Sequence, residues 1–329
     1  MKRKINFVGW YDQRNIGDEA FRLAHDVLFP DSDKIYDQNS NYDSDSLIVL
    51  GGGDVVLPYY IDTIPESRDF YVLGCGLGYQ EEIKFLENRD VKHAIFRNAE
   101  DAEAALALGI KSEFAPDITF VVDPENYKKS CSLPTSSRSV KKLCVLLTDQ
   151  ISPSPLHKES ALLSYFDYFK WELASSLDFL SEFYDIYWLP FSDHENDRDL
   201  RIIYDVQGRM AEKQSSYVLP YPGSPEAALS IISEMDLVVS MKFHGVMFST
   251  NLGIPFVNIG VSRKTQLFCE ANGYSDLSIK PFCFTRDSLL AAVKAAETEG
   301  VPLRLLQDSR RFRIHLLKIR DDVLNKWRY

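Results

Sequence analysis

Short apolar runs alternate along the chain with longer segments in which apolar residues recur at helical spacing. The runs lie at 4–11, 46–50, 70–73, 94–96, 143–148, 186–191, 217–219, 237–241 and 255–259. Helical spacing follows at 19–29, 99–108, 165–183, 198–210, 224–235, 246–252, 285–299 and 303–327. Short runs of this kind are typical of buried parallel strands, and their alternation with helices predicts an α/β fold.

One stretch interrupts this alternation. Residues 126–142 are polar, contain Ser, Thr, Pro and Lys, and show no periodicity, which is typical of a linker. The sequence therefore predicts two doubly wound, Rossmann-like domains, at 1–130 and 140–302, each with its own parallel sheet.

Composition and charge narrow the class of protein. The charged share of 26% among the 329 residues suits a soluble globular protein. The net charge of −11 argues against nonspecific binding of nucleic acid. The chain start lacks a signal-peptide pattern, and no apolar stretch approaches the ~20 residues of a bilayer span. Five scattered cysteines without a CxxC pair indicate reduced thiols. We expect a cytoplasmic protein, with peripheral attachment to the inner face of the membrane left open.

Candidate chemistry in the second half lies in the segment 236–269. His244 follows an apolar run, and Arg263 and Lys264 open the next helix after another. Ligands of doubly wound sheets bind beyond the carboxyl ends of the strands, and a helix start favours an anion. We interpret the segment as an enzyme site that holds a phosphate and moves a proton. A half-buried structural histidine and a solvated surface lysine are the alternative interpretations.

Three features mark strand ends in the first half. Asp18 stands where a turn enters a helix, as either a helix cap or a carboxylate that takes a proton from a substrate hydroxyl. Gly51, Gly52 and Gly53 follow a buried run and let backbone amides approach a ligand. Arg97 ends a third run, either to grip a carboxylate or phosphate or to pair with Glu100 or Asp101 nearby. His194 has acidic neighbours, but no second set of ligands has metal-site spacing, so we expect no metal.

In order along the chain, these elements resemble the polysaccharide pyruvyl transferase family. The similar segments are 15–20 (NIGDEA, like the family's NxGDEA), 51–53 (its glycine loop), 96–101 (FRNAED, like its VRDxxS), 108–110 and 115–117 (its LGv and aPD), 242–245 (KFHG, like its R-L-H-[AG]) and 262–265 (SRKT, like its DPKV). Each match is short, but the order and spacing together are specific.

The resemblance implies a GT-B arrangement, with two Rossmann-like domains facing a cleft and the last helix, 303–329, packed back on the first domain. It implies phosphoenolpyruvate as the donor, without a further cofactor. It also implies as acceptor a sugar of an exopolysaccharide or of its lipid-linked precursor, and a pyruvate ketal and phosphate as products. Functional roles are implied at the positions of Asp18, Arg97, His244 and Lys264.

The chemistry assigns roles to these residue types. His244 would protonate the methylene carbon of the donor, and Asp18 would accept the hydroxyl proton. Arg97, Lys264 and Lys242 would neutralise the donor and the leaving phosphate. Arg263, Gly17, Gly52 and Gly53 complete the substrate-binding residues that we predict.

The sequence departs from the family pattern at three positions. Lys242 replaces an Arg, Phe243 a Leu and Asn98 an Asp. Two other functions therefore stay open: a GT-B glycosyltransferase that uses a nucleotide sugar, and a sugar-binding relative without catalysis. The sequence does not identify the acceptor sugar, the hydroxyls joined or the oligomeric state.

Overall fold

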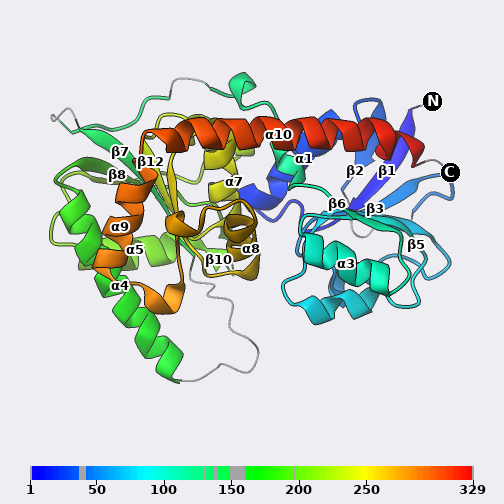
Figure 1. Ribbon diagram of the computed structural model, residues 1–329, viewed down its shortest axis with the longest axis horizontal. Helices are drawn as coiled ribbons and strands as arrows, with labels where there is room; N and C mark the ends of the chain where they lie inside the picture. Colours follow the sequence, from blue (N-terminus) through cyan, green and yellow to red (C-terminus); the bar gives the residue numbers. More distant parts are fainter. Residues whose placement is uncertain are drawn as a thin grey trace. The chain divides into compact units, whose positions relative to one another are not determined.

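The structure, a computed structural model, describes residues 2–36, 42–128, 131–136, 140–148, 160–195 and 197–327 (Figure 1). Its contacts divide the chain into two units. The first consists of Met1–Gln13, Asp18–Asp123 and Ser309–Tyr329, and the second of Arg14–Gly17 and Pro124–Asp308. Each unit contains one six-stranded sheet, which confirms the predicted pair of doubly wound α/β folds.

The sheet of the first unit has the strand order β2-β1-β3-β4-β5-β6, with all neighbours parallel. Its strands are β1 (Arg3–Val8), β2 (Ser32–Ile35), β3 (Leu47–Gly53), β4 (Phe70–Cys75), β5 (Val91–Phe96) and β6 (Ser112–Phe114). The connections include α1 (Ile16–Leu28), α2 (Pro58–Ile61), α3 (Ala99–Ala107) and the 3₁₀ helices η1 (Gln80–Leu86) and η2 (Ile118–Val121). Every residue of β3 is buried, as expected for a central parallel strand that is covered on both faces.

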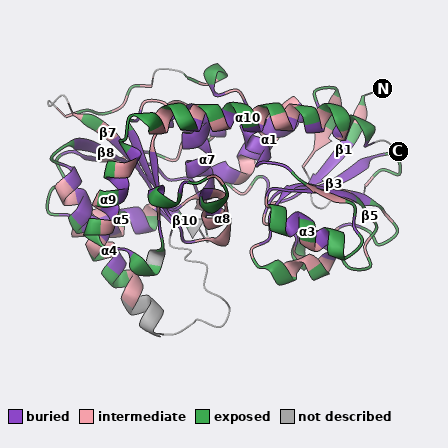
Figure 2. Cartoon of the chain, viewed as in Figure 1, coloured by how far each residue is buried: buried purple, intermediate pink, exposed green. Residues whose placement is uncertain are grey.

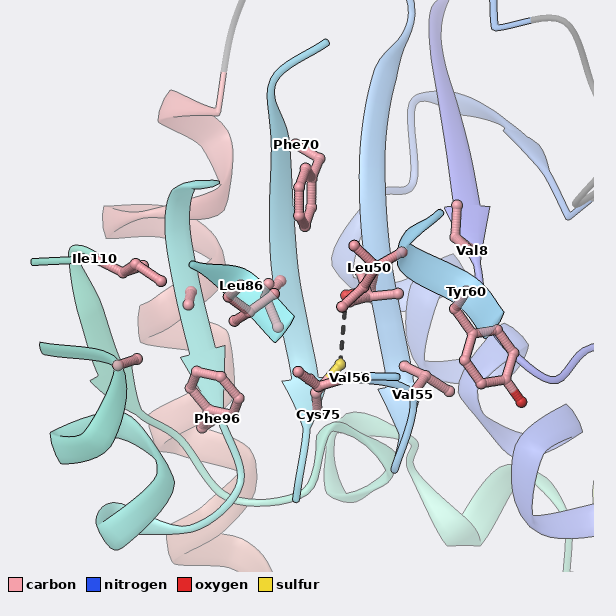
Figure 3. Close-up of a cluster of buried hydrophobic side chains, with 14 of the residues drawn as sticks. Val8, Leu50, Val55, Val56, Tyr60, Phe70, Cys75, Leu86, Phe96 and Ile110 are labelled. Carbon is pink, nitrogen blue, oxygen red and sulfur yellow. Dashed lines mark hydrogen bonds between the residues drawn. The ribbon is translucent and has the colours of Figure 1, made fainter. Parts of the chain in front are cut away.

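A hydrophobic cluster on this sheet holds the first unit together (Figure 3). Phe70, Phe96 and Leu50 are fully buried in it, and each such side chain contributes about 1.5–3 kcal/mol to stability. The Cys75 thiol donates a hydrogen bond to the Leu50 carbonyl oxygen at 3.5 Å, and burial raises the pKa of Cys75 to about 12. Cys75 therefore acts as a core residue and not as a reactive thiolate.

The sheet of the second unit has the order β11-β8-β7-β12-β13-β14, again fully parallel. Its strands are β7 (Lys141–Leu146), β8 (Tyr184–Trp188), β11 (Ser216–Val218), β12 (Leu237–Ser240), β13 (Phe256–Ile259) and β14 (Ser278–Ile279). The helices are α4 (Ser160–Leu180), α5 (Asp199–Arg209), α6 (Pro225–Ile232), α7 (Phe243–Leu252), α8 (Arg263–Ala271) and α9 (Arg286–Ala296). A small ladder, β9 (Asp193–His194) with β10 (Asp197–Arg198), precedes α5.

Helix α7 is buried on all sides, as Figure 2 shows. Its apolar residues are not confined to one face, and its polar residues are buried as well, which is the pattern of a helix inside a core. Its two hydroxyl side chains form hydrogen bonds within the helix: Ser249 donates to the Gly245 carbonyl at 2.8 Å, and Thr250 donates to the Val246 carbonyl at 2.9 Å. The helix ends at Leu252, and the next residue, Gly253, has a φ of 72°, the left-handed conformation of a C-terminal cap.

Helix α10 (Gly300–Asp322) contributes to both units, because the division falls within it at Asp308/Ser309. We expected the linker at 126–142 and the helix 303–329 with the first domain. The units divide at Asp123/Pro124, and only the part from Ser309 onward belongs to the first. Within the expected linker, residues 129–130 and 137–139 lie outside the described ranges.

The chain segment after α10 is attached to the first sheet by aromatic contacts. Trp327 stacks on Tyr71 with ring centroids 4.4 Å apart, and its indole N–H donates to Nδ1 of His93 at 3.2 Å. Nε2 of His93 lies 3.0 Å from Oε1 of Glu113. An imidazole that accepts at Nδ1 and donates at Nε2 must be neutral. Burial and the charge of Lys111 accordingly lower the pKa of His93 to about 4.

This neutral histidine predicts an acid-sensitive attachment. Because the folded-state pKa lies below the ordinary value of about 6.5, the contribution of His93 is fully present above pH 6.5 and is lost as the pH falls towards 4. His93→Gln keeps an acceptor and a donor but does not titrate. We expect the stability difference between wild type and His93→Gln, measured by urea unfolding, to shift in favour of the variant between pH 7 and 4.5. A constant difference would contradict the prediction.

Candidate active site

The strand orders locate the ligand-binding edge of each sheet. In the first sheet the direction of winding reverses between β1 and β3, and in the second between β7 and β12. Ligands of doubly wound sheets bind beyond the carboxyl ends of the strands at such reversals. Helix α1 follows β1, the glycines of the predicted loop (51–53) form the carboxyl end of β3 itself, and His244 follows β12. Both predicted groups of site residues therefore stand at the expected edge of their own sheet.

Asp18 lies inside helix α1 and not at its cap. The helix begins at Ile16, and Oδ1 of Asn15 accepts a hydrogen bond from the Gly17 backbone N–H at 3.0 Å, which is the capping contact. The capping role considered for Asp18 is therefore wrong. Asp18 occupies the first turn, where the helix dipole favours a carboxylate. A Cβ on Gly53 would lie 3.2 Å from Oδ1 of Asp18, so this carboxylate rests against the glycine loop.

The backbone of the glycine loop adopts a conformation that residues with a side chain rarely adopt. Gly52 and Gly53 have φ values of 76° and 86°, in the left-handed region. A Cβ on Gly52 would also overlap the ring of Phe21, a fully buried residue of α1. The loop thus packs directly on the helix that carries Asp18.

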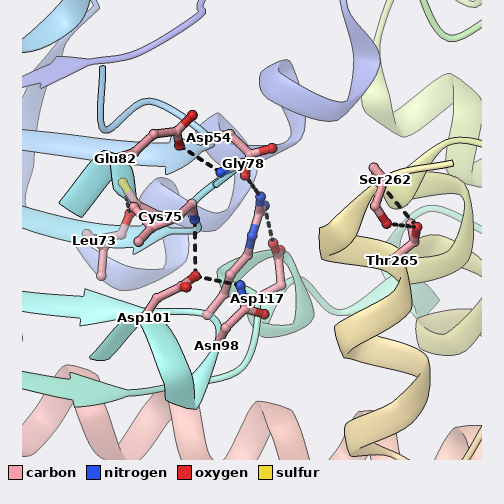
Figure 4. Close-up of polar contacts among 12 residues, drawn as sticks. Asp54, Leu73, Cys75, Gly78, Glu82, Asn98, Asp101, Asp117, Ser262 and Thr265 are labelled. Carbon is pink, nitrogen blue, oxygen red and sulfur yellow. Dashed lines mark hydrogen bonds and ion pairs between the residues drawn. The ribbon is translucent and has the colours of Figure 1, made fainter. Parts of the chain in front are cut away.

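Arg97, at the end of β5, is held by two carboxylates. It forms an ion pair with Asp54, and its Nη1 lies 3.4 Å from Oδ2 of Asp117 (Figure 4). Burial alone would lower the pKa of Arg97, but Asp54 and Asp117 outweigh it and raise the pKa above the usual value. These two partners, Asp54 and Asp117, come from the segments that follow β3 and β6 and were not among the partners considered from the sequence, Glu100 and Asp101. Gly76 makes the close approach possible, because a Cβ there would lie 2.6 Å from Nε of Arg97.

Asn98, one of the departures from the family pattern, has a partner that explains it. The residue precedes helix α3 but makes no capping bond; its Nδ2 donates to Oδ2 of Asp101 at 2.7 Å. Asp101 is fully buried and also accepts from the Leu77 backbone N–H at 3.1 Å. A second carboxylate at position 98 would face this buried one, which is unfavourable. The amide therefore suits this chain, in which Asp101 stands where the family pattern has Ser.

His244 lies in the first turn of α7 and is 7% exposed. The helix begins at Phe243, three residues earlier than the expected 246, which places the imidazole at the helix N-terminus. A Cβ on Gly17 would overlap Nδ1 of His244, so this glycine of the NIGDEA segment packs directly on the imidazole. Phe243 packs edge-on against the same ring, with centroids 5.1 Å apart. The structure thus brings together Gly17 and His244, which are separated by most of the chain.

Lys242 forms an ion pair with a buried carboxylate. Its Nζ lies 2.6 Å from Oδ1 of Asp199, whose side chain is 1% exposed. Oδ2 of Asp199 accepts from the backbone N–H groups of Phe191 and Ser192, both at 2.8 Å. This contact fixes the position of Lys242 next to His244 and ties the segment after β8 to the start of α7. The prediction that Lys242 binds substrate remains a prediction.

Arg263 and Lys264 occupy the first turn of α8, after the N-terminal residue Ser262. Nζ of Lys264 lies 5.8 Å from the ring centroid of Phe243, within the range of a cation–π contact. Thr265 closes this turn by donating to the Ser262 carbonyl at 2.9 Å (Figure 4). Phe243 therefore lies between His244 and Lys264, which connects the two helix starts that sequence patterns had identified separately.

Sequence reasoning missed the carboxylates that hold the cations. Asp54, Asp117 and Asp199 partner Arg97 and Lys242, and none was among the predicted site residues. Asp117 ends the segment 115–117, which resembles a family motif, and Asp54 directly follows the glycine segment 51–53. These positions were the available signal. Asp199 carried no such signal, because the contact depends on how the segment after β8 folds back.

We also searched the described residues for a cavity, a metal site and a membrane-spanning helix. A cavity of about 1000 Å³ opens beside the amino-terminal parts of β1 and β3, at the end of the first sheet opposite to the glycine loop. It is lined by as many cations as carboxylates: Lys2, Arg3, Lys4 and Arg68, with Asp33, Asp43, Asp45 and Asp69. Within the described ranges, no group of His, Cys, Asp or Glu is arranged to hold a metal ion. Nor does any helix there combine the length and the apolar character that crossing a membrane requires.

Solved structures resemble the chain in fold. An apo structure of OtsA matches with a TM-score of 0.51 and 12% identity, over 91% of this chain and 74% of the other. A trehalose-6-phosphate structure from E. coli bound with UDP-2-fluoro glucose gives 0.53 and 12%, over 92% and 77%. The N-terminal domain of Candida albicans trehalose-6-phosphate phosphatase gives 0.53 and 11%, over 99% and 97%. These likenesses confirm the predicted GT-B-like fold class.

The sequence comparison identifies the family. No curated protein sequence matches the chain significantly. The family model of polysaccharide pyruvyl transferases, however, matches residues 5–263, which is more than half of the 329 residues and includes every predicted site residue except Lys264. The chain therefore belongs to the polysaccharide pyruvyl transferase family.

Proposed function

We propose that the protein transfers the pyruvyl group of phosphoenolpyruvate to a sugar, forms a pyruvate ketal and releases phosphate. The observation that carries the proposal is the placement of His244. This imidazole lies at a helix N-terminus, at the reversal point of the second sheet, with Lys242 adjacent and Phe243 between it and Lys264. Family membership supports the same reaction class.

The donor is an anion that the second unit is suited to bind. Phosphoenolpyruvate carries a carboxylate and a phosphate, which require cations and backbone N–H groups. The second unit offers the N-termini of α7 and α8 together with Lys242, Arg263 and Lys264. We propose these groups as the donor-binding residues, with Gly17 positioning His244. Arg97, Gly52 and Gly53 remain predicted binding residues in the first unit.

The chemical step requires an acid and a base. His244 would donate a proton to the methylene carbon while a sugar hydroxyl attacks the neighbouring carbon, and Asp18 would accept the hydroxyl proton. The cations would stabilise the charge on the leaving phosphate. The reaction needs neither a metal nor a further cofactor. The acceptor would be a sugar of a polysaccharide or of its lipid-linked precursor, reached from the cytoplasm.

A direct assay tests this function. The purified protein is incubated with phosphoenolpyruvate and a panel of p-nitrophenyl hexosides; phosphate release is measured, and the products are analysed by mass spectrometry. We expect acceptor-dependent phosphate release and a product that has gained one pyruvyl ketal. Transfer of a hexose from a nucleotide sugar in a parallel reaction would instead indicate a glycosyltransferase. Binding of sugar without either reaction would indicate a non-catalytic relative.

Lys264 provides a test of the donor site. Lys264→Ala should weaken phosphoenolpyruvate binding about 10- to 100-fold, as expected for the loss of a charge-assisted contact of about 1.5–3 kcal/mol. The loss should shrink as salt is raised, because salt screens the attraction. Lys294→Ala, which removes an exposed cation of α9, is the matched control. Calorimetry that gives equal affinity for wild type and Lys264→Ala would exclude the assignment.

A further inference from the structure

Arg97, Asp54 and Asp117 form two ion pairs, and among these three side chains only that of Asp54 is accessible to solvent. The side chains of Arg97 and Asp117 are each 2% exposed, whereas that of Asp54 is 27% exposed. Asp117 is fixed further, because its Oδ1 accepts from the backbone N–H of Thr119 at 3.0 Å and from the Thr119 hydroxyl at 2.6 Å. A molecule that approaches this edge of the first sheet would therefore meet the Asp54 carboxylate and not the guanidinium.

Asp54 and Asp18 flank the same glycine. Asp54 follows Gly53 directly, and Asp18 rests against Gly53 from helix α1. The two carboxylates also act on one buried phenol: burial, Asp18 and Asp54 all raise the pKa of Tyr60. The carboxyl end of β3 thus presents two carboxylates on separate supports, one on a helix and one held by Arg97.

We propose that Asp54 is a second proton-accepting residue of this site, and that Arg97 is the positioning residue that orients it, while Asp117 is a structural counter-ion of the guanidinium. The inference rests on the proposed function, because it concerns the acceptor side of the same reaction. It differs from the prediction made for Arg97: here the guanidinium acts through Asp54, while the donor is bound by the cations of the second unit.

The stoichiometry of ketal formation explains why the site would use two proton acceptors. A ketal joins one carbon to two hydroxyl oxygens, so two O–H bonds must break. In the first step a sugar oxygen bonds to the central carbon of the donor, and one carboxylate accepts the proton of that hydroxyl. The electron pair of the double bond takes a proton from His244 at the methylene carbon, which becomes a methyl group. In the second step the other sugar oxygen bonds to that carbon, the bond to the phosphate oxygen breaks, and the phosphate leaves with the electron pair. A second carboxylate accepts the second hydroxyl proton.

The protons balance over the two steps. Of the two hydroxyl protons, one replaces the proton that His244 gave to the new methyl group, and the other leaves with the phosphate. No oxidant or reductant is required. A site with one base would have to release its proton between the steps, whereas Asp18 and Asp54 can each serve one hydroxyl.

The two partners of Arg97 form a matched pair for the test. Asp54→Asn and Asp117→Asn each remove one negative charge next to the same guanidinium, but only Asp54 is accessible. With phosphoenolpyruvate and the p-nitrophenyl hexoside panel, we expect Asp54→Asn to release phosphate at least about 10²-fold more slowly than wild type, the lower end of general-base contributions. Its phosphoenolpyruvate affinity should not fall, and Asp54→Glu should retain more turnover than Asp54→Asn. Asp117→Asn should lose turnover only as far as it loses folded protein.

Each outcome is decisive. Wild-type phosphate release together with an Asp54→Asn variant of similar turnover would overturn the inference and leave the proposed function intact. Equal losses in Asp54→Asn and Asp117→Asn that follow the melting temperature would also overturn it, since they indicate a structural counter-ion. Absence of phosphate release by the wild type would overturn the proposed function itself, and the inference with it.

Discussion

A His244→Asn variant should fold normally and bind phosphoenolpyruvate, yet transfer pyruvate about 10²–10⁴-fold more slowly than the wild type, the range of general acid catalysis. Asparagine keeps a similar shape and a hydrogen-bonding group next to Gly17, so the packing at the start of α7 should persist. It cannot deliver a proton near neutral pH. The loss should therefore appear in turnover and not in donor affinity.

Three measurements on this variant separate catalysis from structure. Melting temperature reports folding, calorimetry reports phosphoenolpyruvate affinity, and phosphate release with the hexoside panel reports turnover. His315→Asn on α10 is the control for a histidine outside the predicted site, and it should retain wild-type turnover. A stable His244→Asn protein with a turnover close to that of the wild type would exclude the catalytic role.

Arg97→Met should produce the largest loss of stability among single substitutions at the site. The change removes the positive charge between Asp54 and Asp117 and leaves the buried Asp117 carboxylate without compensation. Removal of one partner from a buried ion pair destabilises a protein by about 3–5 kcal/mol. The partial exposure of Asp54 places the expected loss at the lower end of this range.

Urea unfolding tests this expectation. Arg201→Met, which removes an exposed cation of α5, should change stability by less than about 0.5 kcal/mol. Addition of Asp54→Asn and Asp117→Asn to Arg97→Met should recover much of the loss, because no buried charge then remains. If Arg97→Met is as stable as the wild type, the ion pairs do not hold this edge of the sheet. If Arg97→Met is destabilised as expected, its affinity for phosphoenolpyruvate must be compared with that of the wild type under conditions in which both proteins are fully folded.

The sheets were predictable from sequence because their central strands are apolar throughout. The runs at 46–50 and 237–241 correspond to β3 and β12, which are buried on both faces. The edge strand β2 has the sequence SDKI and was missed, because a half-exposed strand has no apolar run to detect. The start of α7 was misplaced because Phe243 and His244 look like a loop after a strand until their burial is known.

The candidate site was predictable as a set of positions but not as a set of contacts. His244, Lys264 and Asp18 follow strand ends, and strand ends can be found locally. The partner of Arg97 is 43 positions away at Asp54, and that of Lys242 is at Asp199. Such pairs form only when the strand order brings the ends of separate elements together. No single stretch of sequence contains that order.

The division within helix α10 has a consequence for biosynthesis. The first unit takes its last residues from the far end of the chain, and Phe312 and Trp327 cover Phe120 and Tyr71 on it. A fragment that ends at Asp123 would leave these aromatic surfaces exposed to water. Domains of most multidomain proteins complete folding in order from the N-terminus during synthesis. Here the unit that is synthesised first can be completed only after the second unit has left the ribosome.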